Sequence, residues 1–340
     1  MRTDDFDYDL PPSFIAQHPA QPRDSARLMI LHRSDGSIAH AVFRDLPRLL
    51  RPGDALVVNE TRVLRARLRA RKLPGGGRVE LLLLHRLEPR LWQAIVGGKG
   101  LGPGVKVEVE GGPAGVIQAA GEGAVRLVRF EESISARLDA IGEVPLPPYI
   151  HEPLLHPDDY QTVYAAQSGS AAAPTAGLHF TAALLEALAS AGVELVKIVL
   201  HVGLDTFAPV DEADPRQHVI HREYCQVEPA AAQAIEQARR SGGRIVAVGT
   251  TTVRTLETAA RGAAPGQVVV PFAGETDLLI LPGHTFGAVD ALITNFHLPR
   301  STLLMLVSAF AGRQRILAAY EAAKAEGYRF YSFGDAMLIL

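Results

Sequence analysis

The chain has 340 residues, of which 47% are hydrophobic and 21% are charged, a composition typical of soluble globular proteins and unlike disordered or fibrous chains. At roughly 150 residues per domain, this length favours about two domains. The 34 Lys and Arg against 37 Asp and Glu give a net charge of −3, an average that argues against a simple basic nucleic-acid-binding protein.

The first sixty residues predict mixed structure. Residues 28–32 and 38–43 flank the turn-forming residues 34–37, which predicts a β-hairpin. Residues 46–50 suit a short helix that Pro52 and Gly53 end. Residues 55–58 then suit a short apolar strand.

From about residue 61 to 149 the pattern changes. Arg65, Arg67, Arg69 and Arg71 alternate with apolar residues, a period of two that predicts a strand with one basic face. Further short apolar segments, separated by Gly and Pro, occupy residues 79–84, 91–96, 105–109 and 124–130. Many short strands with such turns predict a small antiparallel barrel or sandwich, which the proline-rich residues 145–148 end.

Beyond residue 150 the pattern is α/β. The predicted helices are residues 182–191, 230–240, 252–260, 303–311 and 316–326. The predicted strands are residues 195–200, 244–248, 278–281, 291–294 and 330–333. This alternation favours a parallel or mostly parallel sheet covered by helices. Residues 165–176 are small and nearly featureless and are expected to form a loop.

Several classes of protein and site are excluded or disfavoured. The single cysteine, Cys225, excludes an intrachain disulfide, a cysteine zinc cluster and an iron–sulfur cluster. The acidic residues 1–5 do not resemble a signal peptide, and no apolar run approaches the ~18 residues of a membrane span. We therefore expect a cytoplasmic location and no contact with a membrane.

Polar clusters follow four predicted strands directly. Ligands in such sheets bind outside the carboxyl ends of the strands, so these clusters predict a site along one rim. The clusters are residues 201–206 (with His201, Gly203 and Thr206), 249–252 (with Gly249, Thr250 and Thr251), 282–285, and 295–297 (with Asn295, Phe296 and His297).

The cluster at 249–252 opens a helix whose first turns carry Arg254. Free backbone N–H groups and the helix dipole favour an anion there, such as a phosphate or a carboxylate. The alternative is a threonine N-cap with surface charges. A Walker A motif is lacking, as is a GxGxxG after a strand, so neither an ATPase nor a standard dinucleotide enzyme is supported.

Three histidines are candidates for acid–base catalysis: His179, His201 and His297. His179 lies just before a helix with Thr181 as its expected N-cap, where the positive helix end favours a neutral imidazole. The alternative for each is a packed histidine that satisfies backbone groups. Without HExxH or comparable spacing, the pattern favours acid–base or hydrogen-bonding roles over a metal site.

Charge divides unevenly along the chain. Residues 61–149 carry 14 basic and 9 acidic residues, a net +5, whereas the remainder carries 20 and 28, a net −8. A basic β-domain on an acidic body suggests a polyanion-binding appendage, with RNA or DNA as the first candidates. The alternative is a solvated basic face in an arginine-rich chain, since only 5 of the 34 basic residues are lysine.

With these clusters in place, the chain closely resembles the S-adenosylmethionine:tRNA ribosyltransferase-isomerases of queuosine biosynthesis. The resemblance runs nearly end to end and is carried by long motifs in a fixed order. They include FDYDLPPSFIAQHP (6–19), NETRVLRARL (59–68), GEVPLPPYI (142–150), AAPTAGLHF (172–180), HVGLDTFAPV (201–210), VGTTTVRTLE (248–257) and ITNFHLPRSTLLMLVSAFAG (293–312).

The resemblance implies an α/β fold in which a larger α/β barrel-like domain is interrupted by a small antiparallel β-barrel. Residues 1–60 and 150–340 would form the discontinuous catalytic domain, and residues 61–149 the inserted barrel. It implies a transferase that moves the ribosyl part of S-adenosylmethionine to the 7-aminomethyl group of a 7-deazaguanine in a tRNA anticodon of GUN type. The ribose isomerises to an epoxycyclopentane, adenine and methionine leave, and epoxyqueuosine-tRNA results.

The implied co-substrate is S-adenosylmethionine, with no metal or other cofactor, and we expect a monomer, with a dimer as the alternative. The resemblance carries over APTAGLHF, HVG, GTT and NFHLP as site segments. By type, Phe180 or Phe296 would stack on adenine unless they belong to the core, and Thr250 and Arg254 would hold the methionine carboxylate. The remaining expected substrate-binding residues from these segments are Thr175, Gly177, Gly203, Thr206, Gly249, Thr251 and Asn295.

The expected RNA contacts lie on the basic strand, at Arg62, Arg65, Arg67, Arg69 and Arg71. Three positions depart from the family pattern: Asp205, Ala208 and Arg222. Two other hypotheses stay open at this point. One is a metal-dependent hydrolase that uses the rim histidines, and the other is a non-catalytic RNA-binding protein.

Overall fold

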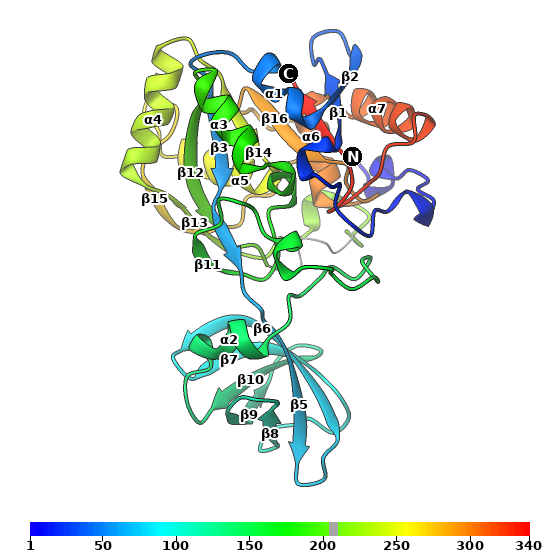
Figure 1. The fold of residues 1–340 in the computed structure, drawn as a ribbon, viewed down its shortest axis with the longest axis vertical. Helices are drawn as coiled ribbons and strands as arrows, with labels where there is room; N and C mark the ends of the chain where they lie inside the picture. Colours follow the sequence, from blue (N-terminus) through cyan, green and yellow to red (C-terminus); the bar gives the residue numbers. More distant parts are fainter. Residues whose placement is uncertain (204–209) are drawn as a thin grey trace. The chain divides into compact units, whose positions relative to one another are not determined.

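Figure 1 shows the fold as a computed structural model that describes residues 1–203 and 210–340. The chain divides into two compact units. Unit 1 comprises Met1–Arg62, Pro148–Gln167 and Ala173–Leu340, and unit 2 comprises Val63–Pro147 with Ser168–Ala172. The fold class is confirmed, because unit 1 is α/β and unit 2 is built on a closed antiparallel barrel.

Unit 1 contains a nine-stranded sheet in the order β15-β13-β12-β3-β14-β16-β17-β1-β2. Strands β12, β3, β14 and β16 are parallel neighbours, whereas β13, β15 and β2 pair antiparallel with their neighbours, as β17 does with β16. The sheet is therefore mixed, not mostly parallel as predicted. The strands are β1 (Arg27–Leu31), β2 (Ile38–Val42), β3 (Ala55–Asn59), β12 (Glu194–Leu200), β13 (Glu223–Val227), β14 (Ile245–Val248), β15 (Phe272–Thr276), β16 (Ala291–Asn295) and β17 (Ala336–Ile339).

Two predicted strands were wrong. Residues 278–281 do not pair with any described strand of the sheet. The carbonyl of Leu278 accepts a hydrogen bond from the side chain of Arg254, and the N–H of Leu278 donates to the hydroxyl of Thr276. Residues 330–333 do not form a strand, because Tyr331 has a φ of +71°, which breaks an extended chain. The sequence analysis also missed β13, β15 and β17.

Helices cover both faces of the sheet. In β3, Ala55 and Val57 pack into one core with residues of α4 to α7, while Leu56 and Val58 pack into a second core with residues of α1 and α3. The predicted N-cap is confirmed, since the Thr181 hydroxyl accepts a hydrogen bond from the N–H of Leu184. The helices of this unit are α1 (Leu46–Leu49), α3 (Ala182–Ser190), α4 (Pro229–Arg240), α5 (Thr250–Ala260), α6 (Thr302–Ala311) and α7 (Arg313–Ala325).

Unit 2 is a closed six-stranded barrel in the order β10-β7-β6-β5-β8-β9, with one short helix, α2 (Leu138–Ile141). Leu68 and Ala70 of β5 are buried while Arg69 and Arg71 are exposed, so the predicted alternation is confirmed. The sequence analysis missed β9, whose residues are mostly small. The strands are β5 (Arg67–Leu73), β6 (Arg78–Glu88), β7 (Leu91–Gly97), β8 (Lys106–Val109), β9 (Ala114–Ala120) and β10 (Val125–Phe130).

Two further strands, β4 (Thr61–Val63) and β11 (Gln167–Ser170), contain residues at which the chain passes between the units. β11 lies within the segment 165–176 that was predicted to be a loop. Among the described residues, no helix is both long enough and apolar enough to cross a membrane.

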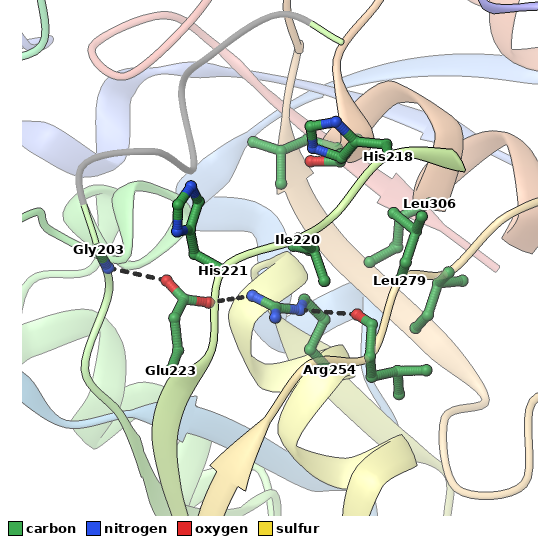
Figure 2. Close-up of a pocket in the computed structure, with 12 residues that line it drawn as sticks. Gly203, His218, Ile220, His221, Glu223, Arg254, Leu279 and Leu306 are labelled. Atoms are coloured by element: carbon green, nitrogen blue, oxygen red, sulfur yellow. Dashed lines mark hydrogen bonds and ion pairs between the residues drawn. The ribbon is translucent and has the colours of Figure 1, made fainter. Parts of the chain in front are cut away.

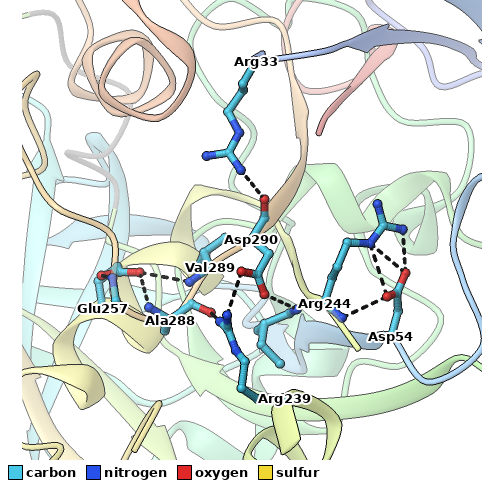
Figure 3. A network of polar contacts seen from close by, with 10 residues as sticks. Arg33, Asp54, Arg239, Arg244, Glu257, Ala288, Val289 and Asp290 are labelled. Atoms are coloured by element: carbon cyan, nitrogen blue, oxygen red, sulfur yellow. Dashed lines mark hydrogen bonds and ion pairs between the residues drawn. The ribbon is translucent and has the colours of Figure 1, made fainter. Parts of the chain in front are cut away.

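A polar network joins the amino ends of the parallel strands (Figure 3). Asp54, just before β3, forms an ion pair of 2.6 Å with Arg244, just before β14. Asp290, just before β16, accepts a hydrogen bond from the N–H of Ile245 and pairs with Arg239 at 2.9 Å. These contacts fix the register of the strands at the edge of the sheet opposite to their carboxyl ends.

Candidate functional site

The carboxyl ends of β12, β3, β14 and β16 form one edge of the sheet, which we call the rim. Asn59, the last residue of β3, lies within it. Its side-chain amide donates to the carbonyl of Leu200 at 2.9 Å and to the hydroxyl of Thr251 at 3.4 Å. Three of the four predicted polar clusters therefore meet at this rim. The fourth, residues 282–285, follows no strand.

Two adjoining hollows of about 360 and 330 Å³ open at the rim, and we call them together the rim pocket. Four residues line both: Thr175, Asn295, His297 and Leu303. Gly249, Thr250 and Thr251 line the first hollow only, and Phe296 the second only. The structure thus brings together predicted site residues from three separate sequence segments.

Asn295 is the centre of the hydrogen bonds in the rim pocket. Its Nδ2 donates to the carbonyl of Tyr331 at 3.2 Å, which fixes the orientation of the amide. The same Nδ2 lies 3.3 Å from Nε2 of His179, so that nitrogen must accept and the His179 proton is on Nδ1. The hydroxyl of Thr175 donates to Oδ1 at 3.0 Å. His179 therefore orients Asn295, which in turn orients Thr175.

His179 itself is 5% exposed and does not line the rim pocket. It ends the 3-10 helix Thr175–His179, and its ring packs 4.9 Å from that of Phe43. Burial, aided by the charges of Arg329 and Arg23, lowers the pKa of His179 to about 3. This histidine is neutral and buried, as in the alternative of a packed histidine. It contacts the pocket residue Asn295 through one hydrogen bond.

His297 does line the rim pocket. Its backbone is held on both sides by tyrosine hydroxyls, since its N–H donates to Tyr320 and its carbonyl accepts from Tyr8. Its Nε2 lies 2.8 Å from the hydroxyl of Thr294. Burial lowers the pKa of His297 to about 3, so the imidazole facing the pocket is neutral near pH 7.

His201 lies at the end of β12, outside the lining of the rim pocket. Its Nδ1 lies 2.8 Å from the hydroxyl of Thr61, and its ring stacks on that of Tyr224 with centroids 5.8 Å apart. Partial burial lowers the pKa of His201. It is half-buried, unlike the other two candidate histidines.

Helix α5 begins at the rim pocket. Gly249 is its N-cap with a φ of +86°, a conformation that side-chain-bearing residues rarely adopt. Thr250 and Thr251 follow at the first helical positions and line the pocket with Gly249. Among the described residues no side chain caps this helix start, so the threonine N-cap considered as the alternative is absent and the anion site stays a prediction.

A third hollow, of about 510 Å³, lies beside Arg254 and shares Leu303 with the rim pocket (Figure 2). We call it the arginine pocket. The Arg254 guanidinium is 4% exposed, donates from Nε to the carbonyl of Leu278 at 3.0 Å, and pairs through Nη1 with Glu223. Glu223 also accepts from the N–H of Gly203 at 2.8 Å. The third nitrogen, Nη2, is buried and has no hydrogen-bond partner among the described residues.

An unpartnered guanidinium nitrogen beside a hollow favours an anionic ligand, because a buried donor without a partner costs about 1–3 kcal/mol. Arg254 also lines this hollow, where its charge is partly balanced by Glu223. Thr250, expected to bind a carboxylate together with Arg254, instead lines the rim pocket one helical turn away.

Three of the residues predicted for the site are tightly packed: Phe180, Phe296 and Gly177. Phe180 is fully buried, with Phe43 and Tyr164 rings 4.9 and 6.2 Å away, and Phe296 is fully buried beside Phe330. Gly177 is required because a Cβ there would clash with the Tyr164 hydroxyl. Besides Phe296, two further aromatic residues line the pocket: Tyr149 and Tyr331, whose rings are 4.8 Å apart.

Sequence reasoning missed Asn59, Tyr149, Tyr331 and Glu223. Asn59 could have been identified from the sequence, because it directly follows the predicted strand 55–58, just as the rim clusters follow their predicted strands. Glu223 opens a strand that the pattern did not reveal, and Tyr331 lay in a segment wrongly predicted as a strand. Thr206, Asp205 and Ala208 lie outside the described residues. Arg222 is exposed and pairs with Glu275 at 3.6 Å.

The basic strand face of unit 2 is largely paired with carboxylates. Arg67, Arg69 and Arg71 lie 3.5, 2.6 and 3.4 Å from Glu80, Glu143 and Glu110. We call these three arginines the arginine stripe. Arg65 donates to the carbonyl of Asp139, and Arg62 is exposed in unit 1. Within the described part of the chain, no group of three or more His, Cys, Asp or Glu residues is arranged to hold a metal ion.

A mixed α/β sheet with a polar rim and an inserted closed barrel define a two-unit class of α/β protein. A family model for "Queuosine biosynthesis protein" matches residues 3–339. The S-adenosylmethionine:tRNA ribosyltransferase-isomerase of Symbiobacterium thermophilum is 55% identical over 100% of both chains, and that of Thermus thermophilus is 53% identical over 98% of both. A crystal structure of S-adenosylmethionine tRNA ribosyltransferase from Thermotoga maritima matches with a TM-score of 0.58 and 41% identity, covering 99% of this chain and 100% of that one.

This chain belongs to the queuosine biosynthesis family of S-adenosylmethionine:tRNA ribosyltransferase-isomerases. The resemblance inferred from the sequence motifs is confirmed, and so is the expectation of a transferase. Membership of this family does not favour the metal-dependent hydrolase or the non-catalytic RNA-binding protein.

Proposed function

We propose that this protein transfers the ribosyl moiety of S-adenosylmethionine to the 7-aminomethyl-7-deazaguanine of a GUN-type tRNA anticodon and isomerises it, giving epoxyqueuosine-tRNA, adenine and methionine. The observation that carries the proposal is a family match over the whole chain together with a rim that collects its motifs. The proposal includes action as a monomer in the cytoplasm, with residues 1–60 and 150–340 as the catalytic domain.

The donor is assigned to the rim pocket and the arginine pocket together. Nη2 of Arg254 would bind the methionine carboxylate, because it is a buried cationic donor without a partner among the described residues. The N-terminus of α5, with Gly249, Thr250 and Thr251, lies one helical turn from Arg254 and faces the rim pocket. The ribosyl and adenine groups would then occupy the rim pocket beside Thr175, Asn295 and His297.

The reaction requires a base, because the sulfonium acidifies the adjacent C5′–H, and a hydrogen-bond donor at the departing adenine. The amine then attacks the sugar, and an alkoxide displaces methionine as the epoxide closes. His297 is the histidine assigned to proton exchange with the substrate, since it alone of the three candidate histidines lines the pocket. Thr175, held by Asn295, would orient the sugar hydroxyls.

The test mixes the purified protein with S-adenosylmethionine and tRNA that carries the aminomethyl-deazaguanine base. Adenine and methionine should appear in equal amounts with the modified tRNA and should not depend on added metal. Absence of adenine from a folded preparation would refute the proposed function. Activity that a chelator abolishes and zinc restores would favour the hydrolase hypothesis instead.

A second prediction distinguishes the roles of His297 and His179 by their effects on kcat. His297→Gln should lower kcat by about 100-fold, the size typical of losing a positioned proton-transfer group. His179→Asn should lower kcat less, because its role is to accept a hydrogen bond that orients Asn295. Both kcat values would be measured at saturating substrates, with melting temperatures as the folding control. Equal activity of wild type and His297→Gln would contradict the assignment.

A further inference from the structure

Unit 2 has a second basic surface, which differs from the arginine stripe in its partners. Each arginine of the stripe lies within 4 Å of a glutamate, which neutralises its charge locally. Lys72, Arg78, Lys99 and Lys106 have no ion-pair partner among the described residues of the chain. We call these four the barrel-end patch.

The strand register places the four residues at one end of the barrel, where the patch adjoins the arginine stripe because Arg78 lies opposite Arg71 of β5. Lys72 is next to last in β5 and Arg78 opens β6, so the two flank one hairpin (Figure 1). Lys106 opens β8 opposite Leu73 of β5 in the antiparallel register. Lys99 lies in the loop after β7, and Nζ of Lys72 donates to the carbonyl of Gly100 in that same loop at 2.9 Å. Two carboxylates lie near these strand ends: Glu108, two residues after Lys106, and Glu80, which is two residues after Arg78 and pairs with Arg67.

Glycines are frequent in the backbone around the patch. Nothing lies within 4 Å of where a Cβ would stand at residues 75–77, the tip of the β5–β6 hairpin. Gly98 and Gly100 have φ values of +139° and +65°, which only glycine adopts readily. Small glycine side chains let a bulky phosphate backbone approach the neighbouring cations closely.

We propose that the barrel-end patch, and not the arginine stripe, is the surface by which unit 2 binds the phosphate backbone of its RNA substrate. The inference rests on the proposed function for the identity of the RNA. Unpaired cations bind phosphates by releasing counterions, whereas an arginine already paired with a glutamate must first lose that partner. Such contacts orient the RNA and carry no sequence information.

The test compares two triple variants with the same change in net charge. One is Lys72→Gln with Lys99→Gln and Lys106→Gln in the patch, and the other is Arg67→Gln with Arg69→Gln and Arg71→Gln in the stripe. The dissociation constant for tRNA would be measured by fluorescence anisotropy across a range of salt. Loss of three phosphate contacts should reduce the slope of log Kd against log salt by about 2 and raise Kd at low salt at least about 10-fold.

The stripe variant should reduce that slope by less than about 1. A stripe variant that loses as much affinity as the patch variant, or more, overturns the proposal, and so does a patch variant with an unchanged slope. Melting temperatures of both variants serve as the folding control. Adenine release by the wild-type protein tests the proposed function separately, so failure of one is distinguishable from failure of the other.

Discussion

Replacing Arg254 by lysine is expected to raise the KM for S-adenosylmethionine by about 10- to 100-fold. A hydrogen bond to a charged group contributes about 1.5–3 kcal/mol, and each 1.4 kcal/mol is tenfold in affinity. Lysine keeps a positive charge beside Glu223 but lacks the planar fork of Arg254, whose Nη2 would bind the carboxylate. Arg254→Lys is preferable to alanine, which would remove the cation beside the buried Glu223 at a cost of about 3–5 kcal/mol.

The matched control is Arg239→Lys, because Arg239 pairs with Asp290 at the opposite edge of the sheet. It should leave the KM for the donor unchanged. The decisive comparison uses decarboxylated S-adenosylmethionine. Wild type should discriminate against it, whereas Arg254→Lys should discriminate much less. Equal discrimination by both proteins would remove Arg254 from the donor site.

The free energy of unfolding is expected to fall steeply as the pH drops below about 6.5. His179 and His297 have pKa values of about 3 when folded, against about 6.5 in an unfolded chain. Between these values the unfolded state binds more protons, so stability falls with decreasing pH by about 1.4 kcal/mol per unit for each histidine. Because the unfolded histidines are only half protonated at pH 6.5, the two together should cost about 3 kcal/mol from pH 6.5 to 5.

Urea denaturation at a series of pH values measures this slope. His179→Gln and His297→Gln should each flatten it, since glutamine does not titrate and each variant removes one buried imidazole. His151→Gln is the control, because His151 is exposed. A slope that stays the same in both buried-site variants would show that other groups cause the acid sensitivity.

The location of the site could be predicted because it follows from strand direction alone. Residues after β12, β14 and β16 meet at one edge as soon as these strands are parallel, and their apolar runs identified them as strands. The alternation of arginines in β5 was equally local, since burial of Leu68 and Ala70 dictates a period of two.

The partners of those residues could not be predicted, because they come from distant segments. Nothing in the sequence around His179 indicates that the side-chain amide of Asn295, 116 residues away, donates a hydrogen bond to its Nε2. The neutralisation of the arginine stripe is of the same kind, since Arg69 meets Glu143 only when the barrel closes. β13 and β15 were missed because polar residues interrupt their apolar pattern.

Tyr331 combines a strained backbone with a place in the rim pocket. A tyrosine at a φ of +71° costs on the order of 1 kcal/mol, which glycine in its place would largely recover. Glycine would also remove the ring that lines the pocket beside Tyr149. Tyr331 is also buried in the main hydrophobic core, and truncating a buried aromatic ring costs about 3–5 kcal/mol, which exceeds the strain that glycine would relieve. Packing of the ring therefore holds the backbone in its strained conformation, and glycine at residue 331 is expected to lower the stability of the fold.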